Sequence, residues 1–474
     1  MRIVVVGAGV GGLACAIRLA RAGHQVTVLE RAATPGGKCS RVRREGFVWD
    51  AGPSLLTMPH VFEALFAETG APLRDELELL RVEPVTRYGF ADGSVLELSA
   101  DLPRALEALE SWSAGSGRDW LRFLGTCASM WRASVPFLEG PAPWPPRRPM
   151  AGAPPPDPRD LARVRPWWTL RQLAKAQIRD PRLRMVVERF ATYAGADPAR
   201  APAALAVAGF VEHVFGAWHP RGGVYELVRA LERRLEALGG RLCLGADVQR
   251  VVVANGRVAA VEAGGRRVPA DAVVSNADAE ALRRGLLEDA GPRRRSPSLS
   301  GLALMLGLRG RTSGLAHHTI SFPARYGEEF ADIFDRGAPA RDPAIYTCAP
   351  SVTDPGDAPD GCEAWFVLVN APAVGDAADW DAAERRVIER LGIGERVIVA
   401  ARRTPGDLER ETGAVGGAIY GAAPHGRLAS LRRPGNAVPG VAGLWQVGGT
   451  VHPGGGLPLV ALGARTVAQE IGPA

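Results

Sequence analysis

A glycine-rich turn between two apolar runs, within residues 3–30, constrains the fold of this chain more than any other feature. The first run is short and β-branched, as in a buried parallel strand. A helical pattern follows it, and the second apolar run ends on Glu30. The turn between strand and helix has the spacing G-x-G-x-x-G at Gly7, Gly9 and Gly12. This order predicts the first βαβ unit of a doubly wound α/β fold.

The same turn predicts a dinucleotide site. The first glycine permits a tight turn, the second lets the backbone approach a pyrophosphate, and the third lets the helix pack against the strand. Backbone N–H groups at the start of the helix, Gly11 among them, are expected to face the phosphates. Glu30 stands where a carboxylate accepts hydrogen bonds from ribose hydroxyls, which argues against NADP. The alternative is a glycine-rich turn in some other α/β protein.

A second glycine element narrows the dinucleotide to FAD. Arg31 follows Glu30 directly, and Gly36, Gly37 and Lys38 come soon after. This run resembles flavoproteins of the glutathione-reductase-like superfamily, in which an E-R…G-G-K/R pattern follows the first βαβ unit. By that resemblance, these residues lie along the diphosphate and ribityl side of the flavin. The same resemblance extends the expected FAD contacts to Gly52, Pro53, Ser54, Val248 and Asn276, with the backbone of Val248 at the adenine.

A glycine-dense loop near the other end of the chain is the second strong signal. A strand runs into V-G-G-T-V-H-P-G-G-G-L-P, at 447–458, and a helix is expected from about 459 to 470. The loop looks like the carboxy-terminal flavin motif of the bacterial carotenoid (phytoene) desaturase family. FAD contacts are therefore expected at Gly448, Gly449, Gly456, Leu457 and Pro458.

Other segments carry the same family resemblance across nearly the whole chain. They are G-F-V-W-D-A-G-P-S-L-L-T at 46–57, A-T-Y-A-G-A-D-P at 191–198, W-H-P-R-G-G-V-Y-E-L at 218–227 and H-H-T-I-S-F at 317–322. The second and third of these look closer to the hydroxycarotenoid 3,4-desaturase subgroup than to phytoene desaturases.

The resemblance implies a glutathione-reductase-like, FAD-binding Rossmann fold of the α/β class with an inserted α+β substrate domain. We expect the FAD-binding domain to be discontinuous, at 1–80, 218–280 and 421–474. The substrate-binding domain is then expected at 81–217 and 281–420.

The implied activity is an FAD-dependent desaturation. C=C bonds would enter a carotenoid polyene by hydride transfer to flavin N5, in a phytoene-type reaction or in 1-hydroxycarotenoid 3,4-desaturation. His452 is the candidate to assist, although the ring could instead only pack or hydrogen bond within its loop; Glu226 is a lesser candidate. Oxygen or a quinone is expected to reoxidise the flavin, because no second dinucleotide motif is evident. The alternatives are a flavin-dependent isomerase or saturase of an apolar substrate, and a non-catalytic FAD-fold escort protein.

The basic excess of the chain is concentrated in one region. The net charge is +6, yet residues 147–184 alone hold ten Lys/Arg against three acids. This distribution argues against nucleic acid as a partner. Within the proline-rich and basic segment 141–184, Trp167 and Trp168 predict either a membrane-contact face or a solvated basic surface. We expect a cytoplasmic protein, peripheral to the inner face of the cell membrane.

The cysteine positions and the apolar stretches indicate which further features are not expected. The six cysteines are scattered and form no C-x-x-C pair, so neither a metal site nor a disulfide is expected. A signal peptide and a transmembrane helix are not expected either, because the apolar stretches are rich in glycine and proline. The oligomeric state is not indicated by the sequence.

Overall fold

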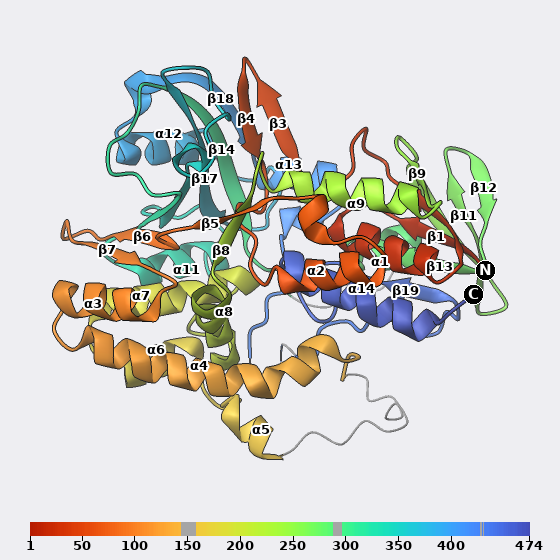
Figure 1. The fold of residues 1–474 in the computed structure, drawn as a ribbon, viewed down its shortest axis with the longest axis horizontal. Coiled ribbons are helices and arrows are strands. Elements are labelled where there is room, and N and C mark those ends of the chain that lie inside the picture. The colour runs from red at the N-terminus through yellow and green to blue at the C-terminus, as the bar shows by residue number, and fades with distance from the viewer. Residues whose placement is uncertain (144–157, 288–295, 427–428, 430) are drawn as a thin grey trace.

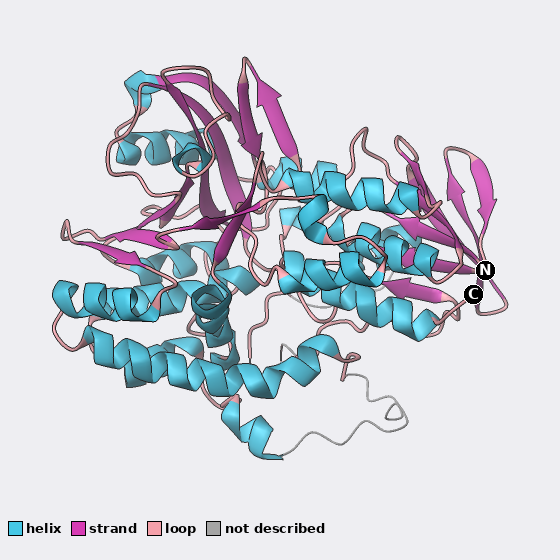
Figure 2. Ribbon diagram, viewed as in Figure 1, coloured by secondary structure: helices cyan, strands magenta, loops and turns pink. Residues whose placement is uncertain are grey.

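The computed structural model describes residues 1–143, 158–287, 296–426, 429 and 431–474. Two large β-sheets lie at opposite ends of the molecule, and helices fill the space beside and below them (Figures 1 and 2). Both chain ends lie side by side at the right-hand end of the molecule, where β1 begins (Figure 1). The mixed α/β architecture predicted from the sequence is confirmed.

The first sheet is parallel and five-stranded, in the order β19-β13-β1-β2-β9. Its strands are β1 (Arg2–Val6), β2 (Gln25–Leu29), β9 (Arg241–Cys243), β13 (Ala272–Ser275) and β19 (Leu444–Gln446). Four helices share one buried core with it: α1 (Val10–Arg21), α2 (His60–Glu68), α9 (Tyr225–Ala237) and α14 (Leu457–Ile471). A three-stranded antiparallel sheet, β10 (Val248–Ala254), β11 (Arg257–Ala263) and β12 (Arg266–Pro269), shares a second core with its strands. Strands β1 and β2 of the five-stranded sheet are the apolar, β-branched runs that the sequence predicts as parallel strands.

The second sheet has seven strands of mixed direction, in the order β18-β14-β17-β16-β15-β6-β7. Its strands are β6 (Thr86–Gly89), β7 (Val95–Leu98), β14 (Ser300–Arg309), β15 (His318–Ser321), β16 (Ile345–Cys348), β17 (Cys362–Ala371) and β18 (Val397–Arg403). The hairpin of β3 (Arg41–Arg44) and β4 (Phe47–Asp50) packs Phe47 and Trp49 against this sheet. Strands β5 (Leu79–Val82) and β8 (Ala217–Pro220) pair with each other. Part of the segment 1–80 therefore packs against the second sheet rather than the first.

Helices form a layer below the second sheet (Figure 1). They are α3 (Leu102–Trp112), α4 (Ser116–Glu139), α5 (Pro158–Arg163), α6 (Leu170–Gln177), α7 (Pro181–Arg189), α8 (Val207–Phe215) and α11 (Tyr326–Phe334). Elsewhere in the chain lie α10 (Ala279–Ala281), α12 (Trp380–Leu391) and α13 (Pro405–Thr412). Within the described ranges, none of the helices has the length and apolar character needed to cross a bilayer.

Two sequence expectations differ in detail, and a third is not covered by the structure. The buried helix expected at 201–215 is a 3₁₀ turn followed by α8, which has only Gly209 and Glu212 buried because it borders a cavity. The single strand expected at 268–277 is two strands, β12 and β13, which belong to different sheets. Most of the proline-rich stretch, residues 144–157, lies outside the described part of the chain.

Candidate cofactor and substrate site

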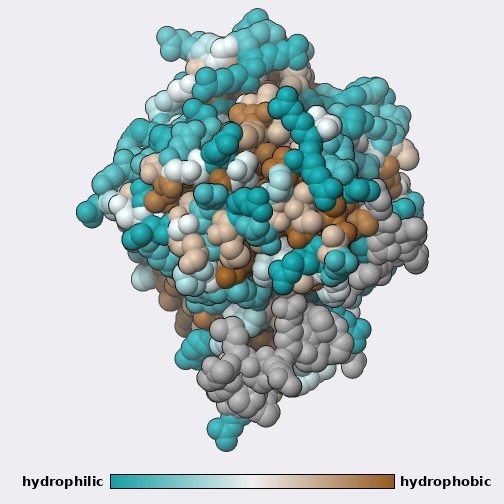
Figure 3. Space-filling view, turned by 90° about the vertical axis from the view of Figure 1, so that its right-hand side faces the viewer, coloured by the Kyte–Doolittle hydropathy of each residue, from teal (hydrophilic) through white to brown (hydrophobic). Residues whose placement is uncertain are grey.

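A single large cavity of about 2680 Å³ runs between the two sheets. Binding sites for one small molecule usually measure roughly 300–1,000 Å³. The cavity therefore has room for a large cofactor and a second, extended molecule together. The face that carries both chain ends shows apolar residues gathered toward its middle, between hydrophilic ones (Figure 3).

Almost every residue predicted to contact a dinucleotide lines this cavity. The lining includes Gly7, Gly9, Gly11, Glu30, Arg31, Gly36, Gly37, Lys38, Gly52, Pro53, Ser54, Val248, Asn276, Gly448, Gly449, Gly456, Leu457 and Pro458. Gly12 does not line it. A Cβ atom on Gly12 would lie 2.2 Å from the carbonyl oxygen of Gly7, so this glycine permits close packing of α1 on β1.

The Asn276 side chain joins the two glycine clusters. It follows β13, and its amide fills the space beside the first glycine loop. A Cβ atom on Gly9 would lie 2.6 Å from Asn276 Nδ2, and one on Gly448 would lie 2.8 Å from Asn276 Oδ1. A Cβ on Gly11 would also come within 3.2 Å of the Gly448 backbone. The amino-terminal and carboxy-terminal loops thus meet at one point, where larger side chains do not fit.

Two helix amino termini open into the cavity. Helix α1 follows Gly9 and helix α14 follows Gly456; neither has a side-chain cap or an acidic residue in its first turn. The N–H groups of a first turn have no partner within their helix, and the helix dipole makes this end positive. Both ends therefore suit an anionic or electron-rich ligand.

Glu30 supplies a buried carboxylate at the end of β2. Its Oε2 accepts a hydrogen bond of 2.7 Å from the Ala8 backbone, and its Oε1 accepts one of 2.9 Å from the Ala32 backbone. These bonds fix the direction of the carboxylate at the cavity wall. The remaining lone pairs of both oxygens can accept from hydroxyl groups of a ligand.

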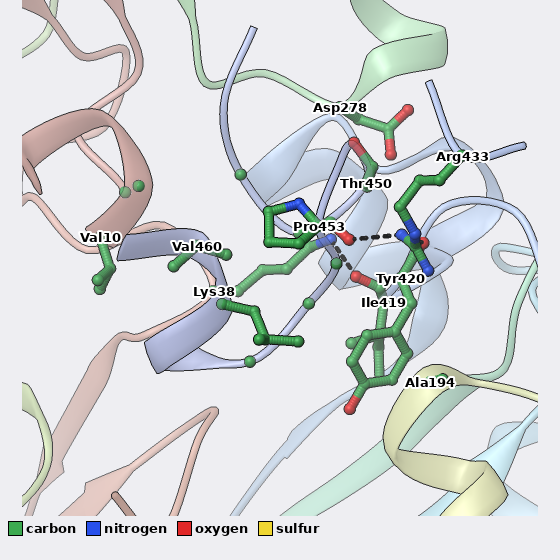
Figure 4. A pocket seen from close by; sticks show the side chains of 18 of the residues that line it. Val10, Lys38, Ala194, Asp278, Ile419, Tyr420, Arg433, Thr450, Pro453 and Val460 are labelled. Atoms are coloured by element: carbon green, nitrogen blue, oxygen red, sulfur yellow. Dashed lines mark hydrogen bonds between the residues drawn. The ribbon is translucent and has the colours of Figure 1, made fainter. Parts of the chain in front are cut away.

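Lys38 and Arg433 line the cavity and donate hydrogen bonds to backbone carbonyls near the carboxy-terminal glycine loop (Figure 4). Lys38 Nζ donates to the carbonyl oxygen of Ile419 at 2.6 Å, and burial lowers the pKa of this amine to about 8. Arg433 Nη1 donates to the carbonyls of Gly449, at 2.9 Å, and Tyr420, at 3.2 Å. Both cations therefore hold backbone in place beside the carboxy-terminal glycine loop.

These features fit a flavin dinucleotide. The close-packed glycines leave flat backbone where a ring system or a diphosphate can approach, and two uncapped helix ends face the same cavity. Glu30 offers acceptors for ribose hydroxyls at the end of the second strand. The residues present thus match the chemistry of FAD.

A polar group that the sequence analysis missed interrupts the cavity wall. Arg189 donates to the hydroxyl of Tyr193, and that hydroxyl donates to Glu212 Oε1. Arg189 Nη2 also lies 3.5 Å from Glu212 Oε1 and 3.1 Å from the Tyr88 hydroxyl. Burial raises the pKa of Tyr193 well above its usual value, so the phenol stays protonated. Arg189, Tyr193 and Glu212 line the cavity, where they form one hydrogen-bonded polar cluster.

The chain just after this cluster and the carboxy-terminal glycine loop contact the same tyrosine ring. The ring of Tyr420 packs between Gly195 and Gly455, because Cβ atoms on these glycines would lie 2.8 Å and 2.5 Å from it. Gly195, two residues after Tyr193 in the chain, therefore contacts the same Tyr420 ring as Gly455 of the loop. The i, i+4 spacing of Arg189 and Tyr193, and a lone acid in the apolar stretch around Glu212, were the available sequence signals.

The expectation that His452 assists chemistry is not supported by its position. His452 does not line the cavity; its Nε2 lies 3.0 Å from the Gly140 carbonyl, and its ring packs edge-on against Phe137. Burial lowers the pKa of the imidazole to about 4. The ring therefore packs the loop against the end of α4. Glu226 is likewise outside the cavity and forms an ion pair with Arg41 at 2.6 Å.

Comparison with known proteins gives a consistent result. Residues 10–306 match the family of flavin containing amine oxidoreductases. The chain is 36% identical to the hydroxyneurosporene desaturase of Rubrivivax gelatinosus, over 99% of this chain and 93% of that protein. It is also 36% identical to the zeta-carotene-forming phytoene desaturase of Myxococcus xanthus, with the same coverage. A solved oxidoreductase from Methanosarcina mazei has the same fold, with a TM-score of 0.66 at 20% identity over 99% of this chain and 100% of that one.

Proposed function

The chain belongs to the flavin containing amine oxidoreductase family and, within it, to the carotenoid desaturases, and from this premise we propose that it desaturates a hydroxylated carotenoid. The broader activity is that of an FAD-dependent oxidoreductase acting on a carotenoid polyene. The finer proposal is 3,4-desaturation of a 1-hydroxycarotenoid rather than a phytoene-type reaction. One observation supports this choice: the polar cluster of Arg189, Tyr193 and Glu212 in the cavity wall.

We propose a set of cavity residues as the contacts for each part of FAD. We propose that Glu30 binds the ribose of the adenosine half and that the start of α1 binds the diphosphate. The loop Gly448–Gly449 and the start of α14 then support the flavin side. FAD, when bound, supplies the acceptor for a hydride, and the protein supplies position and an environment without water.

The walls beyond the glycine loops position the polyene. Phe366, Leu368, Ile320 and Val211 line the cavity and offer no hydrogen bond, so they suit a long hydrocarbon. Because an apolar wall excludes water, a developing positive charge on the polyene is protected from hydrolysis.

The polar cluster provides hydrogen bonds for one end group. A hydroxyl on the substrate can donate to Glu212 or to the Tyr193 oxygen and can accept from Arg189. A hydrocarbon end group offers none of these bonds. A site built to hydrogen bond a hydroxyl rejects the analogue that lacks it, because the polar groups of the site are left without their partner. The cluster would therefore select hydroxylated substrates close to the flavin.

Pigment conversion tests both levels of the proposal. The protein is expressed in bacteria that accumulate a 1-hydroxycarotenoid, neurosporene or phytoene, and the extracted pigments are compared by absorption spectra. We expect a red-shifted product from the hydroxylated substrate alone. Conversion of phytoene but not of the hydroxylated carotenoid would contradict the finer proposal, and unchanged pigments in all three hosts would contradict desaturation itself.

Removal of one hydroxyl from the wall tests the cluster directly. Tyr193→Phe should reduce conversion of the hydroxylated substrate roughly 10- to 100-fold, since hydrogen bonds to charged groups contribute about 1.5–3 kcal/mol. Tyr326→Phe is the matched control, because its phenol lines the same cavity and has no hydrogen-bond partner among the described residues. Equal activity of the Tyr193 variant and the control would remove the cluster from substrate recognition.

A membrane surface is the proposed source of this apolar substrate. Trp167 is 52% exposed between α5 and α6, beside Arg163 and Arg165, whereas Trp168 packs partly into the helical layer. Aromatic and basic side chains together favour the interface of anionic lipids. Trp167→Ser should weaken binding to anionic vesicles, whereas Leu244→Ser, at an exposed apolar residue elsewhere, should not. Vesicle binding that is equal for both variants would contradict this placement.

The electron acceptor is proposed to be oxygen or a quinone.

A further inference from the structure

Two histidines and one cysteine, side chains of the kinds that can bind a metal, meet in the second sheet outside the cavity lining. His318 on β15 and Cys348 on β16 are paired across the two strands, and His317 precedes His318. All three are at most 2% exposed, and none of them lines the cavity. One ring nitrogen from each histidine and the Cys348 Sγ lie within 4.8 Å of one another.

Both histidines have one nitrogen occupied and the other free. His318 Nδ1 lies 2.7 Å from the Tyr346 hydroxyl, and His317 Nδ1 lies 2.7 Å from Thr353 Oγ1. The Nε2 atoms of both rings are buried, and neither has a hydrogen-bond partner among the residues that the structure describes. Metal-binding histidines show this pattern, because a hydrogen bond at one nitrogen fixes the tautomer that leaves the other nitrogen as ligand.

A third histidine lies next to the group. The ring of His219, on β8, lies 4.8 Å from the ring of His317, and the rings of His317 and His318 lie 4.4 Å apart. Neither nitrogen of His219 has a hydrogen-bond partner in the described chain, although Nε2 lies 3.7 Å from the Asp354 carboxylate. Across the three rings, four ring nitrogens have no hydrogen-bond partner among the described residues, and two of them are the Nε2 atoms of His317 and His318. A cation between His317, His318 and Cys348 would give these two Nε2 atoms a partner.

We propose that His317, His318 and Cys348 bind one zinc ion, with His219 positioned to complete the coordination. Imidazole and thiolate ligands in a buried, four-coordinate arrangement favour Zn²⁺ over Mg²⁺ or Ca²⁺, which prefer oxygen ligands. The ion would link β15 and β16 to β8 and so fix the second sheet against the β5–β8 pair. Its role is structural, since its ligands do not reach the cavity.

Zinc binding at this site has a defined proton balance. A cysteine side chain without a bound ion keeps its thiol proton at neutral pH. When zinc binds, the S–H bond breaks, the Zn–S bond forms and one proton leaves to solvent. The two histidines bind through Nε2 without losing a proton. No electron is transferred, because Zn²⁺ has no redox chemistry.

Metal content of the full-length, FAD-loaded protein tests this site. The protein is produced in zinc-supplemented medium, and zinc and FAD per chain are measured by mass spectrometry and absorbance. We expect about one zinc per chain in the wild type, and a loss of roughly tenfold or more in Cys348→Ser and His318→Gln. Cys362→Ser is the matched control, because this half-buried thiol lies in the same sheet outside the group. FAD content reports whether each variant is folded.

The zinc spectrum of the wild type keeps the proposal testable even if the variants fail to fold. X-ray absorption should show one sulfur at about 2.3 Å and nitrogens at about 2.0–2.1 Å. A wild-type protein that contains no zinc and takes up none when titrated overturns the proposal. Zinc bound without sulfur, or retained fully in Cys348→Ser, overturns the ligand assignment. The metal measurement does not depend on desaturase activity.

Discussion

Replacement of Glu30 by glutamine isolates the contribution of one carboxylate to FAD binding. In the wild type both oxygens are oriented by backbone N–H groups, of Ala8 at 2.7 Å and Ala32 at 2.9 Å, and the residue is buried at the cavity wall. Glutamine has nearly the same shape but no charge and only one acceptor oxygen. The variant therefore loses charge-assisted hydrogen bonds to the ribose and keeps the packing.

The expected effect is a loss of affinity. Hydrogen bonds to a charged group contribute about 1.5–3 kcal/mol, which corresponds to roughly 10- to 100-fold weaker FAD binding. The dissociation constant is measured by titrating the FAD-depleted protein with FAD and following flavin fluorescence. Glu63→Gln on α2 is the control, because that carboxylate is exposed and lies outside the cavity.

Stability of the FAD-free protein separates binding from folding. If Glu30 acts on the ribose, the variant should bind FAD less tightly, while its FAD-free form unfolds within about 1–2 kcal/mol of the wild type. An unchanged dissociation constant would refute the assignment of Glu30 to the ribose. A large loss of stability with unchanged affinity would show that the carboxylate serves only the backbone of Ala8 and Ala32.

Three further outcomes are expected. Gly12→Ala should destabilise the protein by about 1–3 kcal/mol or more in urea unfolding, because its Cβ would lie 2.2 Å from the Gly7 carbonyl oxygen; Gly125→Ala, with open space around it, should not. Burial raises the pKa of the Glu329 carboxyl from 4.5 to about 7, so between these pH values the folded protein keeps a proton that the unfolded chain loses. The free energy of unfolding should therefore fall by about 3 kcal/mol as the pH rises from 4.5 to 7. Glu329→Gln should flatten this part of the stability profile. His452→Gln should lower the unfolding temperature without changing the pH dependence of turnover. A shifted pH profile would show that the His452 imidazole takes part in the reaction.

Local sequence was sufficient to predict the cofactor half of the molecule. The βαβ unit and its glycine spacing depend on residues 3–30 alone, because strand period, helix period and turn chemistry are set by neighbours in the chain. Helices α1 and α14 begin within about two residues of where the sequence places them. The expected contacts at Glu30, Asn276 and Gly448 all line one cavity, although their binding to FAD stays a prediction.

Tertiary structure alone decided which distant polar side chains meet in the cavity wall. Glu212 lies on α8, and no local pattern relates it to Arg189 and Tyr193, yet the hydrogen bonds form because the fold packs α8 beside the segment 190–194. His452 has a strong motif around it, but the fold packs its ring against Phe137, with Nε2 beside the Gly140 carbonyl, and the residue does not line the cavity. His317 and His318 meet Cys348 through the pairing of β15 with β16, a contact between residues about 30 positions apart. Sequence determines short-range geometry, whereas the partners of a buried polar group depend on which distant elements the packing brings together.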